Sequence, residues 1–236
     1  MVHGAWFSDV GTREINEDAA NVVEENGRLV AVVADGLGGQ GGGDVASAIA
    51  VKQLCNLECI GGNLHEQFML ANDLIMQKQI AGQKMMTTVV ALHIEDRHAR
   101  WAHMGDARLY HFYEGRLLMQ THDHSVSQMA VYRNEITQAE IRFHEDRNRV
   151  LRALGGDEEV KEEQNDICLE EGFHSFLLCT DGFWEYVLEE EMEQALRCAP
   201  TPEDWLVKMC NILQEKKATE HDNFTAAAVF YTGENR

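Results

Sequence analysis

Short apolar stretches recur along the chain, some alternating with polar residues and some continuous, and they predict β-strands. We expect these strands over about 5–10, 20–24, 28–34, 87–94, 98–104, 108–113, 116–120, 175–180 and 224–231. Tight turns such as Asp96-Arg97 and Glu114-Gly115 join neighbouring strands in the middle of the chain. Turns of this length connect antiparallel hairpins, whereas parallel strands need a long crossover.

Other segments carry apolar residues at the helical period. They predict a helix that begins near Asp44, its expected N-cap, and further helices over about 64–80, 189–197 and 202–216. We interpret the polar, helical segment 124–153 as an appendage to the core. Antiparallel strands with separate helix pairs predict an α+β fold, a four-layer sandwich of two mainly antiparallel sheets packed face to face with helices on both outer sides (α-β-β-α).

The length of 236 residues suits one domain that can bury a core without disulfides or a structural metal. Because the sequence offers no Pro/Gly/Ser-rich linker, we expect a single domain over 1–236. The chain has 40 Asp and Glu against 20 Lys and Arg, a formal net charge of −20. Nucleic acid and anionic membrane surfaces are held by neutralising phosphates with basic residues, so this charge argues against both as main partners.

The N-terminus has no charged start followed by an apolar stretch, and no window approaches the roughly 18 apolar residues of a membrane span. We therefore expect a cytoplasmic protein without membrane insertion. The six cysteines fit a reducing compartment that keeps them as thiols. Cys55 and Cys59 suggest a zinc site only weakly, since no second Cys or His pair stands at the required spacing, and buried thiols are the favoured interpretation.

Carboxylates stand directly beside several of the predicted strands. Asp35 and Asp181 each follow an apolar strand and precede a glycine, and Asp222 lies two residues before the last strand. Each Asp-Gly pair taken alone is ordinary turn chemistry. If these residues and Asp18 converge at one edge of a sheet, their mutual repulsion requires divalent cations. Oxygen ligands favour Mg²⁺ or Mn²⁺ over zinc.

Seven short motifs that include these residues occur in an order and spacing that resembles the metal-dependent protein phosphatases, the type 2C serine/threonine family, in a compact bacterial form. The motifs are Gly11-Thr-Arg13-Glu-Ile-Asn16-Glu17-Asp18, Val33-Ala-Asp35-Gly36-Leu-Gly38-Gly39, Gly105-Asp106-Ala-Arg108, Thr121-His-Asp123-His124-Ser125, Leu154-Gly155, Cys179-Thr-Asp181-Gly182 and Asp222-Asn223-Phe-Thr225. Each motif alone is weak, but their shared order makes the resemblance specific over nearly the whole chain.

The resemblance implies a core site for two ions of Mn²⁺ or Mg²⁺. Asp35 would bridge the two ions. Asp181 and Asp222 would hold one ion, and the Gly36 carbonyl would contact the other. Asp18 would act through metal-bound water.

The resemblance also assigns roles around this core. Arg13 matches the family's phosphate-binding arginine, whose planar fork suits two phosphoryl oxygens. Asp123 matches a ligand of a third, weaker ion, which pairs with Asp181 in bacterial relatives. The segment at about 124–153 matches a mobile flap that borders the site and touches the substrate protein.

The implied function is hydrolysis of phosphoserine and phosphothreonine in proteins by direct attack of a metal-bridged hydroxide. The ions and Arg13 would stabilise charge on the phosphoryl oxygens. Bacterial relatives commonly oppose a serine/threonine kinase. The implied partners are therefore phosphoprotein substrates and such a kinase.

Some positions depart from the family pattern. Leu37 stands where eukaryotic relatives often carry a histidine proposed to protonate the leaving group, so the general acid is unassigned. His122 and His124 are candidates, although histidines beside an acidic site more often serve as hydrogen-bonding partners. We expect Asp106 and Arg108 to support the fold by hydrogen bonds rather than to contact metal.

Two alternatives compete with an active phosphatase. The glycine-dense loop at 35–43 allows nucleotide binding, but it lacks a Gly-Lys-Ser/Thr ending and begins with an aspartate that repels phosphate. The other alternative is a catalytically inactive pseudophosphatase, a scaffold that binds phosphoproteins. Loss of a metal carboxylate would mark such a scaffold, and none is lost in this sequence.

Overall fold

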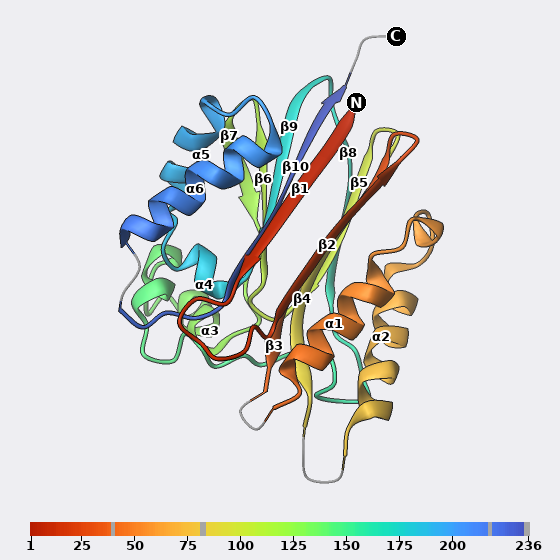
Figure 1. Ribbon diagram of the computed structural model, residues 1–236, viewed down its shortest axis with the longest axis vertical. Coiled ribbons are helices and arrows are strands. Elements are labelled where there is room, and N and C mark those ends of the chain that lie inside the picture. Colours follow the sequence, from red (N-terminus) through yellow and green to blue (C-terminus); the bar gives the residue numbers. More distant parts are fainter. Residues whose placement is uncertain (39–40, 81–83, 217–218, 234–236) are drawn as a thin grey trace.

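The strands form two five-stranded sheets that lie face to face (Figure 1). The computed structural model describes residues 1–38, 41–80, 84–216 and 219–233. Sheet A has the strand order β1-β10-β9-β6-β7, and sheet B has the order β2-β3-β4-β5-β8. Neighbouring strands within both sheets are antiparallel, which confirms the predicted α+β sandwich.

Each sheet draws its strands from distant parts of the sequence. Sheet A consists of β1 (Val2–Asp9), β6 (Arg108–Tyr113), β7 (Arg116–Gln120), β9 (Gly172–Cys179) and β10 (Phe224–Gly233). Sheet B consists of β2 (Asp18–Glu25), β3 (Arg28–Leu37), β4 (Met86–Glu95), β5 (His98–Met104) and β8 (Glu163–Cys168). The last strand, β10, therefore pairs with the first strand, β1.

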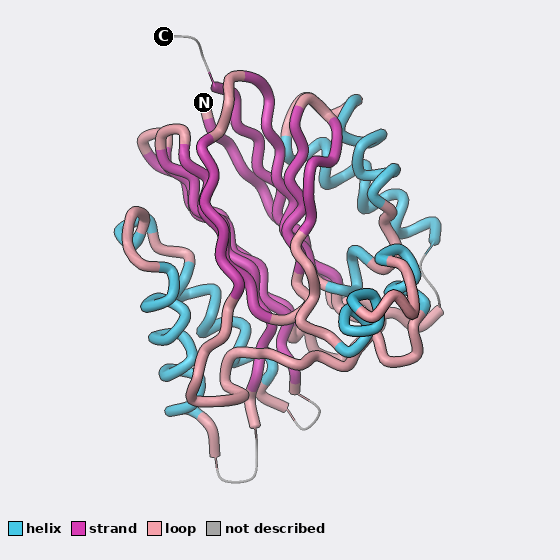
Figure 2. Tube along the Cα trace, turned by 180° about the vertical axis from the view of Figure 1, so that it is seen from behind, coloured by secondary structure: helices cyan, strands magenta, loops and turns pink. Residues whose placement is uncertain are grey.

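Helices cover the outer face of each sheet, as the view from behind shows most clearly (Figure 2). On sheet B lie α1 (Gly43–Leu54) and α2 (Leu64–Lys78), which are linked by the short 3-10 helix η1 (Leu57–Cys59). On sheet A lie α4 (Asp181–Trp184), α5 (Glu189–Arg197) and α6 (Pro202–Lys216). Among the described residues, none of the helices combines the length and apolarity that crossing a membrane would take.

Three apolar layers hold this arrangement together. The layer between the sheets includes Val33, Val90, Leu178 and Val229. The other two layers fill the space between each sheet and its helices. Burial of continuous apolar strands on both faces is the main source of stability in such a sandwich, and it holds the strand ends in place.

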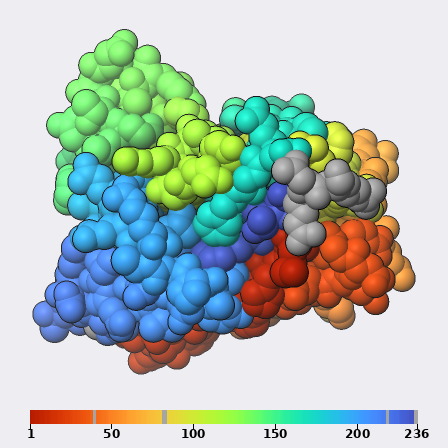
Figure 3. All heavy atoms as spheres, turned by 90° about the horizontal axis from the view of Figure 1, so that it is seen from above, coloured from red at the N-terminus to blue at the C-terminus, as the bar shows by residue number. Residues whose placement is uncertain are grey.

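The segment between β7 and β8 forms a separate lobe at one end of the sandwich. It contains α3 (Val126–Tyr132) and the 3-10 helix η2 (Gln138–Phe143). In the space-filling view this green segment stands out from the rest of the molecule (Figure 3). Backbone hydrogen bonds join its two ends, from Val126 N–H to the Arg149 carbonyl and from Leu151 N–H to the His124 carbonyl.

Two local predictions need correction. Helix α1 begins at Gly43 and its N-cap is Gly42, whose φ is 101°, so Asp44 lies in the first turn instead of capping the helix. Strand β8 and helix α4 were not expected. Gly39 and Gln40 of the glycine-dense loop lie outside the described residues.

Candidate active site

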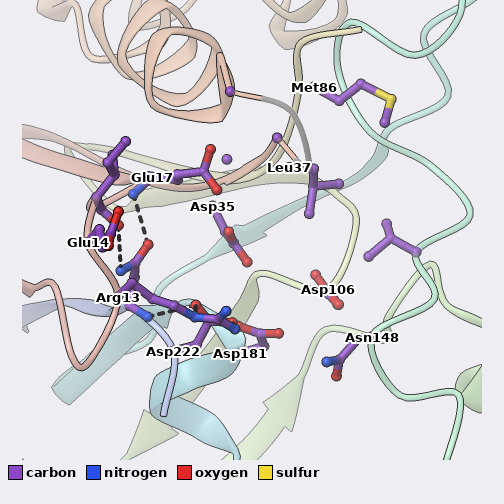
Figure 4. Close-up of a pocket in the computed structure, with 16 residues that line it drawn as sticks. Arg13, Glu14, Glu17, Asp35, Leu37, Met86, Asp106, Asn148, Asp181 and Asp222 are labelled. Carbon is purple, nitrogen blue, oxygen red and sulfur yellow. Dashed lines mark hydrogen bonds and ion pairs between the residues drawn. The ribbon is translucent and has the colours of Figure 1, made fainter. Parts of the chain in front are cut away.

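A cavity of about 520 Å³ opens at the end of the sandwich where β3, α4 and the residues before β10 meet. Six carboxylates from distant parts of the chain line it (Figure 4). They belong to Glu14, Glu17, Asp35, Asp106, Asp181 and Asp222. Among the described residues that line this cavity, Arg13 is the one cation.

Asp35 is fixed by the antiparallel pairing of β2, β3 and β4. In the strand register it lies opposite Asp18 on one side and Thr88 on the other. Asp18 is 9% exposed and is not among the residues that line the cavity. Its carboxylate accepts a hydrogen bond from Thr180 Oγ1 at 2.8 Å. Asp18 therefore lies behind Asp35 and links β2 to the residue before Asp181.

The residue after Asp35 must be a glycine for a packing reason. A side chain on Gly36 would place its Cβ only 2.2 Å from the Gly43 carbonyl oxygen at the start of α1. The Gly36 N–H donates to the Glu17 carbonyl at 3.1 Å. Gly36 lines the cavity, as the sequence predicts.

Asp181 is the first residue of the short helix α4, which directly follows β9. The chain before β10 lies close against this helix, since a Cβ on Gly182 would come within 2.0 Å of the Asn223 carbonyl oxygen. This close approach brings Asp222 beside Asp181 at the cavity. The two Asp-Gly pairs of the sequence thus mark sites of tight backbone packing as well as carboxylates.

Asp106 lines the same cavity from the turn between β5 and β6. It is 3% exposed, and its Oδ1 atom has no hydrogen-bond partner among the described residues. We expected Asp106 and Arg108 to support the fold by hydrogen bonds; Arg108 does so through Asp123, whereas the Oδ1 atom of Asp106 does not. Asp106 instead presents an unpartnered oxygen in an acidic cavity.

Arg13 makes a two-pronged ion pair with Asp222. Its Nε and Nη2 atoms donate to Oδ1 and Oδ2 at 3.0 and 2.8 Å. The Arg13 side chain is more than half exposed, and its guanidinium fork has further N–H donors. The predicted phosphate-binding arginine therefore reaches the cavity already in contact with one predicted metal ligand.

The electrostatics of the cavity favour cations. Burial, followed by the neighbouring Asp181 and then Asp18, raises the pKa of Asp35 well above its ordinary value. Burial and then the charge of Asp106 raise the pKa of Asp181 in the same direction. Burial raises the pKa of Asp18 and of Asp106 to about 7. A divalent cation would remove this repulsion, and a ligand set made only of oxygen atoms suits Mg²⁺ or Mn²⁺.

The structure places Asp123 in an ion pair with Arg108. Both of its carboxylate oxygens accept hydrogen bonds from Arg108, at 2.7 and 2.8 Å, and both side chains are 1% exposed. Asp123 does not line the cavity. The physical reason is that a buried arginine needs a carboxylate partner, and Asp123 serves that purpose in place of Asp106.

The two histidines considered as the general acid also lie away from the cavity. His124, His103 and Glu163 bring side-chain ligand atoms within 4.8 Å of one another in the described part of the chain. However, Gly105 N–H donates to His124 Nδ1 at 3.1 Å, which places the proton of the neutral ring on Nε2. Nε2 of His124 then carries a hydrogen and has no lone pair to offer a metal ion. The cluster of His103, His124 and Glu163 is therefore poorly suited to bind one.

Sequence reasoning did not place Glu14, Asp106 or Asn148 at the cavity. Asn148 enters from the lobe, and Asp106 from the turn before β6. Glu17 was noted only as the neighbour of Asp18; it lines the cavity, and burial raises the pKa of its carboxyl. The signal for Glu17 was its place directly before Asp18, the first residue of β2. No sequence pattern distinguished Asn148 from other polar residues of the lobe.

Comparison with known proteins agrees with this geometry. The sequence model of the family described as protein phosphatase 2C matches residues 8–223. The chain is 31% identical over 211 residues to the serine/threonine phosphatase stp of Listeria welshimeri, a match that covers 83% of each protein. It is also 31% identical over 204 residues to the serine/threonine protein phosphatase PstP of Mycobacterium tuberculosis, covering 80% of this chain and 38% of that protein.

Solved structures show the same fold. The crystal structure of the Mycobacterium tuberculosis serine/threonine phosphatase PstP/Ppp superposes with a TM-score of 0.83 at 27% identity, covering 98% of this chain and 99% of the other. The catalytic domain of the serine threonine protein phosphatase PstP in complex with two manganese ions gives a TM-score of 0.83 at 26% identity, with the same coverage.

Proposed function

This chain belongs to the protein phosphatase 2C family of metal-dependent serine/threonine protein phosphatases, and we propose that its acidic cavity is the site of phosphate-ester hydrolysis. One observation carries the proposal. Six carboxylates, which offer only oxygen atoms as ligands, line a cavity open to the surface together with one arginine among its described residues. Such a set is unfavourable without cations and well suited to two or more divalent ions with a phosphate group.

The residues that would hold Mn²⁺ or Mg²⁺ follow from their places around the cavity. Asp35 and the Gly36 carbonyl would contribute from the end of β3. Asp181 and Asp222 would contribute from the start of α4 and the approach to β10. Asp18, which is buried beside Asp35, would orient that carboxylate through the contact with Thr180. Divalent ions supply Lewis-acid chemistry at such a site, because they lower the pKa of water and neutralise phosphoryl charge.

A third ion, if bound, would lie between Asp106 and Asp181. The unpartnered Oδ1 atom of Asp106 and its raised pKa support this choice over Asp123, whose oxygens are both used by Arg108.

Arg13 would bind the substrate phosphate. Its guanidinium faces the cavity beside Asp222, and its remaining N–H donors can hydrogen-bond to phosphoryl oxygens. As charge moves onto these oxygens during hydrolysis, a fixed guanidinium stabilises it without reorganisation. When a cation holds Asp222, the Arg13 fork would turn toward the substrate.

The remaining assignments are part of the same proposal. We infer a single catalytic domain over 1–236, with the segment at about 124–153 as a flap that contacts the substrate protein, because Asn148 and Val150 line the cavity. Phosphoproteins would be the substrates and a serine/threonine kinase the opposing enzyme. All six cysteines are free, which supports a reducing compartment such as the cytoplasm.

The proposal is tested by hydrolysis of a phosphothreonine peptide. The protein is stripped of metal with a chelator and assayed before and after Mn²⁺ or Mg²⁺ is restored. The Asp35→Asn variant is compared with Asp166→Asn, which changes an exposed carboxylate on β8 far from the cavity lining. We expect activity that requires the ion, is lost in Asp35→Asn and is kept in Asp166→Asn. A folded protein that is inactive with every ion would support the scaffold alternative.

A further inference from the structure

The side chain of Trp184 connects the two chain segments that carry Asp106 and Asp181. Trp184 is the last residue of α4, three residues after Asp181, and its ring is 1% exposed. Its indole Nε1–H donates to the backbone carbonyl of Asp106 at 3.0 Å. The short helix that carries Asp181 is therefore bonded directly to the main chain of Asp106.

The face of the same ring packs against Arg108, two residues beyond Asp106. The Arg108 Cζ atom lies 3.5 Å from the ring centroid, a cation–π contact. Arg108 is itself held by both oxygens of Asp123. Trp184 thus contacts the turn before β6 twice, through its N–H at Asp106 and through its ring face at Arg108.

The other side of Asp106 is fixed as well. Gly105 N–H donates to His124 Nδ1 at 3.1 Å, and His124 N–H donates to the Gly105 carbonyl at 2.8 Å. The main chain around Asp106 is therefore held on both sides, while the Oδ1 atom of its side chain has no partner among the described residues. This is the arrangement of a ligand that the protein positions in advance.

We propose that Trp184 is a positioning residue that fixes the separation between Asp106 and Asp181 and so sets the affinity for a divalent ion held between them. The inference rests on the proposed function. It adds that the affinity depends on a hydrogen bond from an indole that touches no ion and no substrate. Groups of this kind typically change metal affinity about 10- to 100-fold when they are removed.

The chain contains a matched control. Trp205 on α6 is also fully buried, and its Nε1–H donates to the Met192 carbonyl at 3.0 Å. Trp184→Phe and Trp205→Phe thus each remove one indole N–H from one buried backbone carbonyl. In Trp184→Phe the carbonyl belongs to Asp106, which lines the cavity. In Trp205→Phe it belongs to Met192, which does not.

The experiment is a calorimetric titration of Mn²⁺ into the metal-stripped protein, with peptide hydrolysis measured over the same range of Mn²⁺. We expect Trp184→Phe to weaken the affinity of one class of Mn²⁺ site about tenfold, with the turnover rate largely recovered at saturating Mn²⁺. Trp205→Phe should leave the affinity unchanged. Adding Trp184→Phe to Asp106→Asn should produce no further loss of affinity, because the effect acts through Asp106.

The outcomes are separable. If wild-type protein neither binds Mn²⁺ nor hydrolyses the peptide, the proposed function fails. If the wild type does both while Trp184→Phe and Trp205→Phe have the same Mn²⁺ affinity, the inference about Trp184 is overturned and the proposed function stands. An additive loss in the double variant would also overturn it.

A second measurement keeps the inference testable if Trp184→Phe does not fold. In ¹⁵N-labelled wild-type protein, the indole N–H resonance of Trp184 should shift as Mg²⁺ is titrated, and that of Trp205 should stay in place. Equal responses of the two resonances would contradict the inference.

Discussion

Asp106 and Asp123 lie on either side of Arg108 and have opposite surroundings. Asp123 receives two charge-assisted hydrogen bonds from the guanidinium and is fully buried. Asp106 has an unpartnered oxygen, faces the cavity, and has its pKa raised to about 7 by burial and then by the charge of Asp123. Asp123 therefore forms an ion pair within the protein, whereas the Oδ1 atom of Asp106 can accept a contact from a ligand.

The contrast shows what separates a structural carboxylate from a functional one. Both side chains are nearly fully buried, so burial does not distinguish them. The difference is whether a protein cation neutralises the charge. Around the cavity, six carboxylates share one described arginine, whereas the neighbouring Arg108–Asp123 ion pair is balanced. Three substitutions and one change of pH test this difference.

The largest effect is expected for Asp181→Asn. Removing a carboxylate from the centre of the cavity should lower kcat/KM about a thousandfold or more, since charge stabilisation at the reacting phosphate is lost. The same change should leave the metal-free protein as stable or more stable, because a buried carboxyl with a raised pKa has been neutralised. Peptide hydrolysis and urea denaturation measure the two effects. Full activity would refute the assigned role.

Asp123→Asn should make the folded protein less stable. Breaking a buried ion pair leaves the Arg108 charge uncompensated, and the free energy of unfolding should fall by about 3 kcal/mol, whether or not Mn²⁺ is present. Asp106→Asn is the matched control, and it should not destabilise the metal-free protein. Denaturation curves for the two variants give the comparison. A stable Asp123→Asn with weakened Mn²⁺ binding would restore Asp123 as a metal ligand.

Arg13→Lys should lower kcat/KM about tenfold. A lysine keeps the charge but loses the planar fork that contacts two oxygens at once. Because the Arg13 side chain is largely exposed, the melting temperature should hardly change. Steady-state kinetics with a phosphothreonine peptide measure the loss, and unchanged kinetics would show that the fork is not used.

The smallest effect is a pH dependence of the metal-free protein. Asp18 and Asp106 have folded-state pKa values of about 7, above the ordinary 3.8, so stability is lost as pH rises through 7 and both carboxyls ionise in the fold. Each group should contribute a loss of about 1 kcal/mol between pH 6.5 and 8. Below about pH 6.5, buried histidines such as His124, whose pKa is lowered to about 3, oppose this trend.

Denaturation at several pH values, in chelator and in Mn²⁺, tests this pH dependence. We expect Mn²⁺ to suppress the loss, because ion binding keeps the carboxylates ionised in the folded state. Asp106→Asn should reduce the slope in chelator. A metal-free protein that gains stability over this range would show that the carboxylates do not govern it.

Much of the fold could be predicted because the apolar pattern decides it. Helices α5 and α6 have the expected bounds, and β3 and β10 are largely apolar runs that become buried interior strands. Strand β8 (Glu-Gln-Asn-Asp-Ile-Cys) was missed because it lies at the edge of sheet B, where mostly exposed polar residues give no periodic signal. β8 forms by pairing with β5 in the folded sheet, and the local sequence gives no sign of that pairing.

The same limit applies to the site: the apolar pattern of the sequence locates residues at strand ends, but it does not predict contacts that form only in the folded protein. Asp35 and Asp181 could be placed because an apolar strand ends at each of them. The family resemblance favoured Asp123 over Asp106 as a ligand of a third ion, and the strand pattern could not test that choice, since both aspartates follow strands. The two residues differ in which of them the Arg108 side chain contacts, and that side chain packs over Trp184 in the folded structure.

The position of β10 between β1 and β9 has a consequence for the order of events during synthesis. Residues 2–9 are made before their strand partner, residues 224–233, which lies more than 200 residues further along the chain. Asp222 belongs to the same later segment. The nascent chain therefore keeps β1 unpaired and the cavity incomplete until the segment of β10 has been made. The same segment then pairs with β1 and brings the last carboxylate to the cavity.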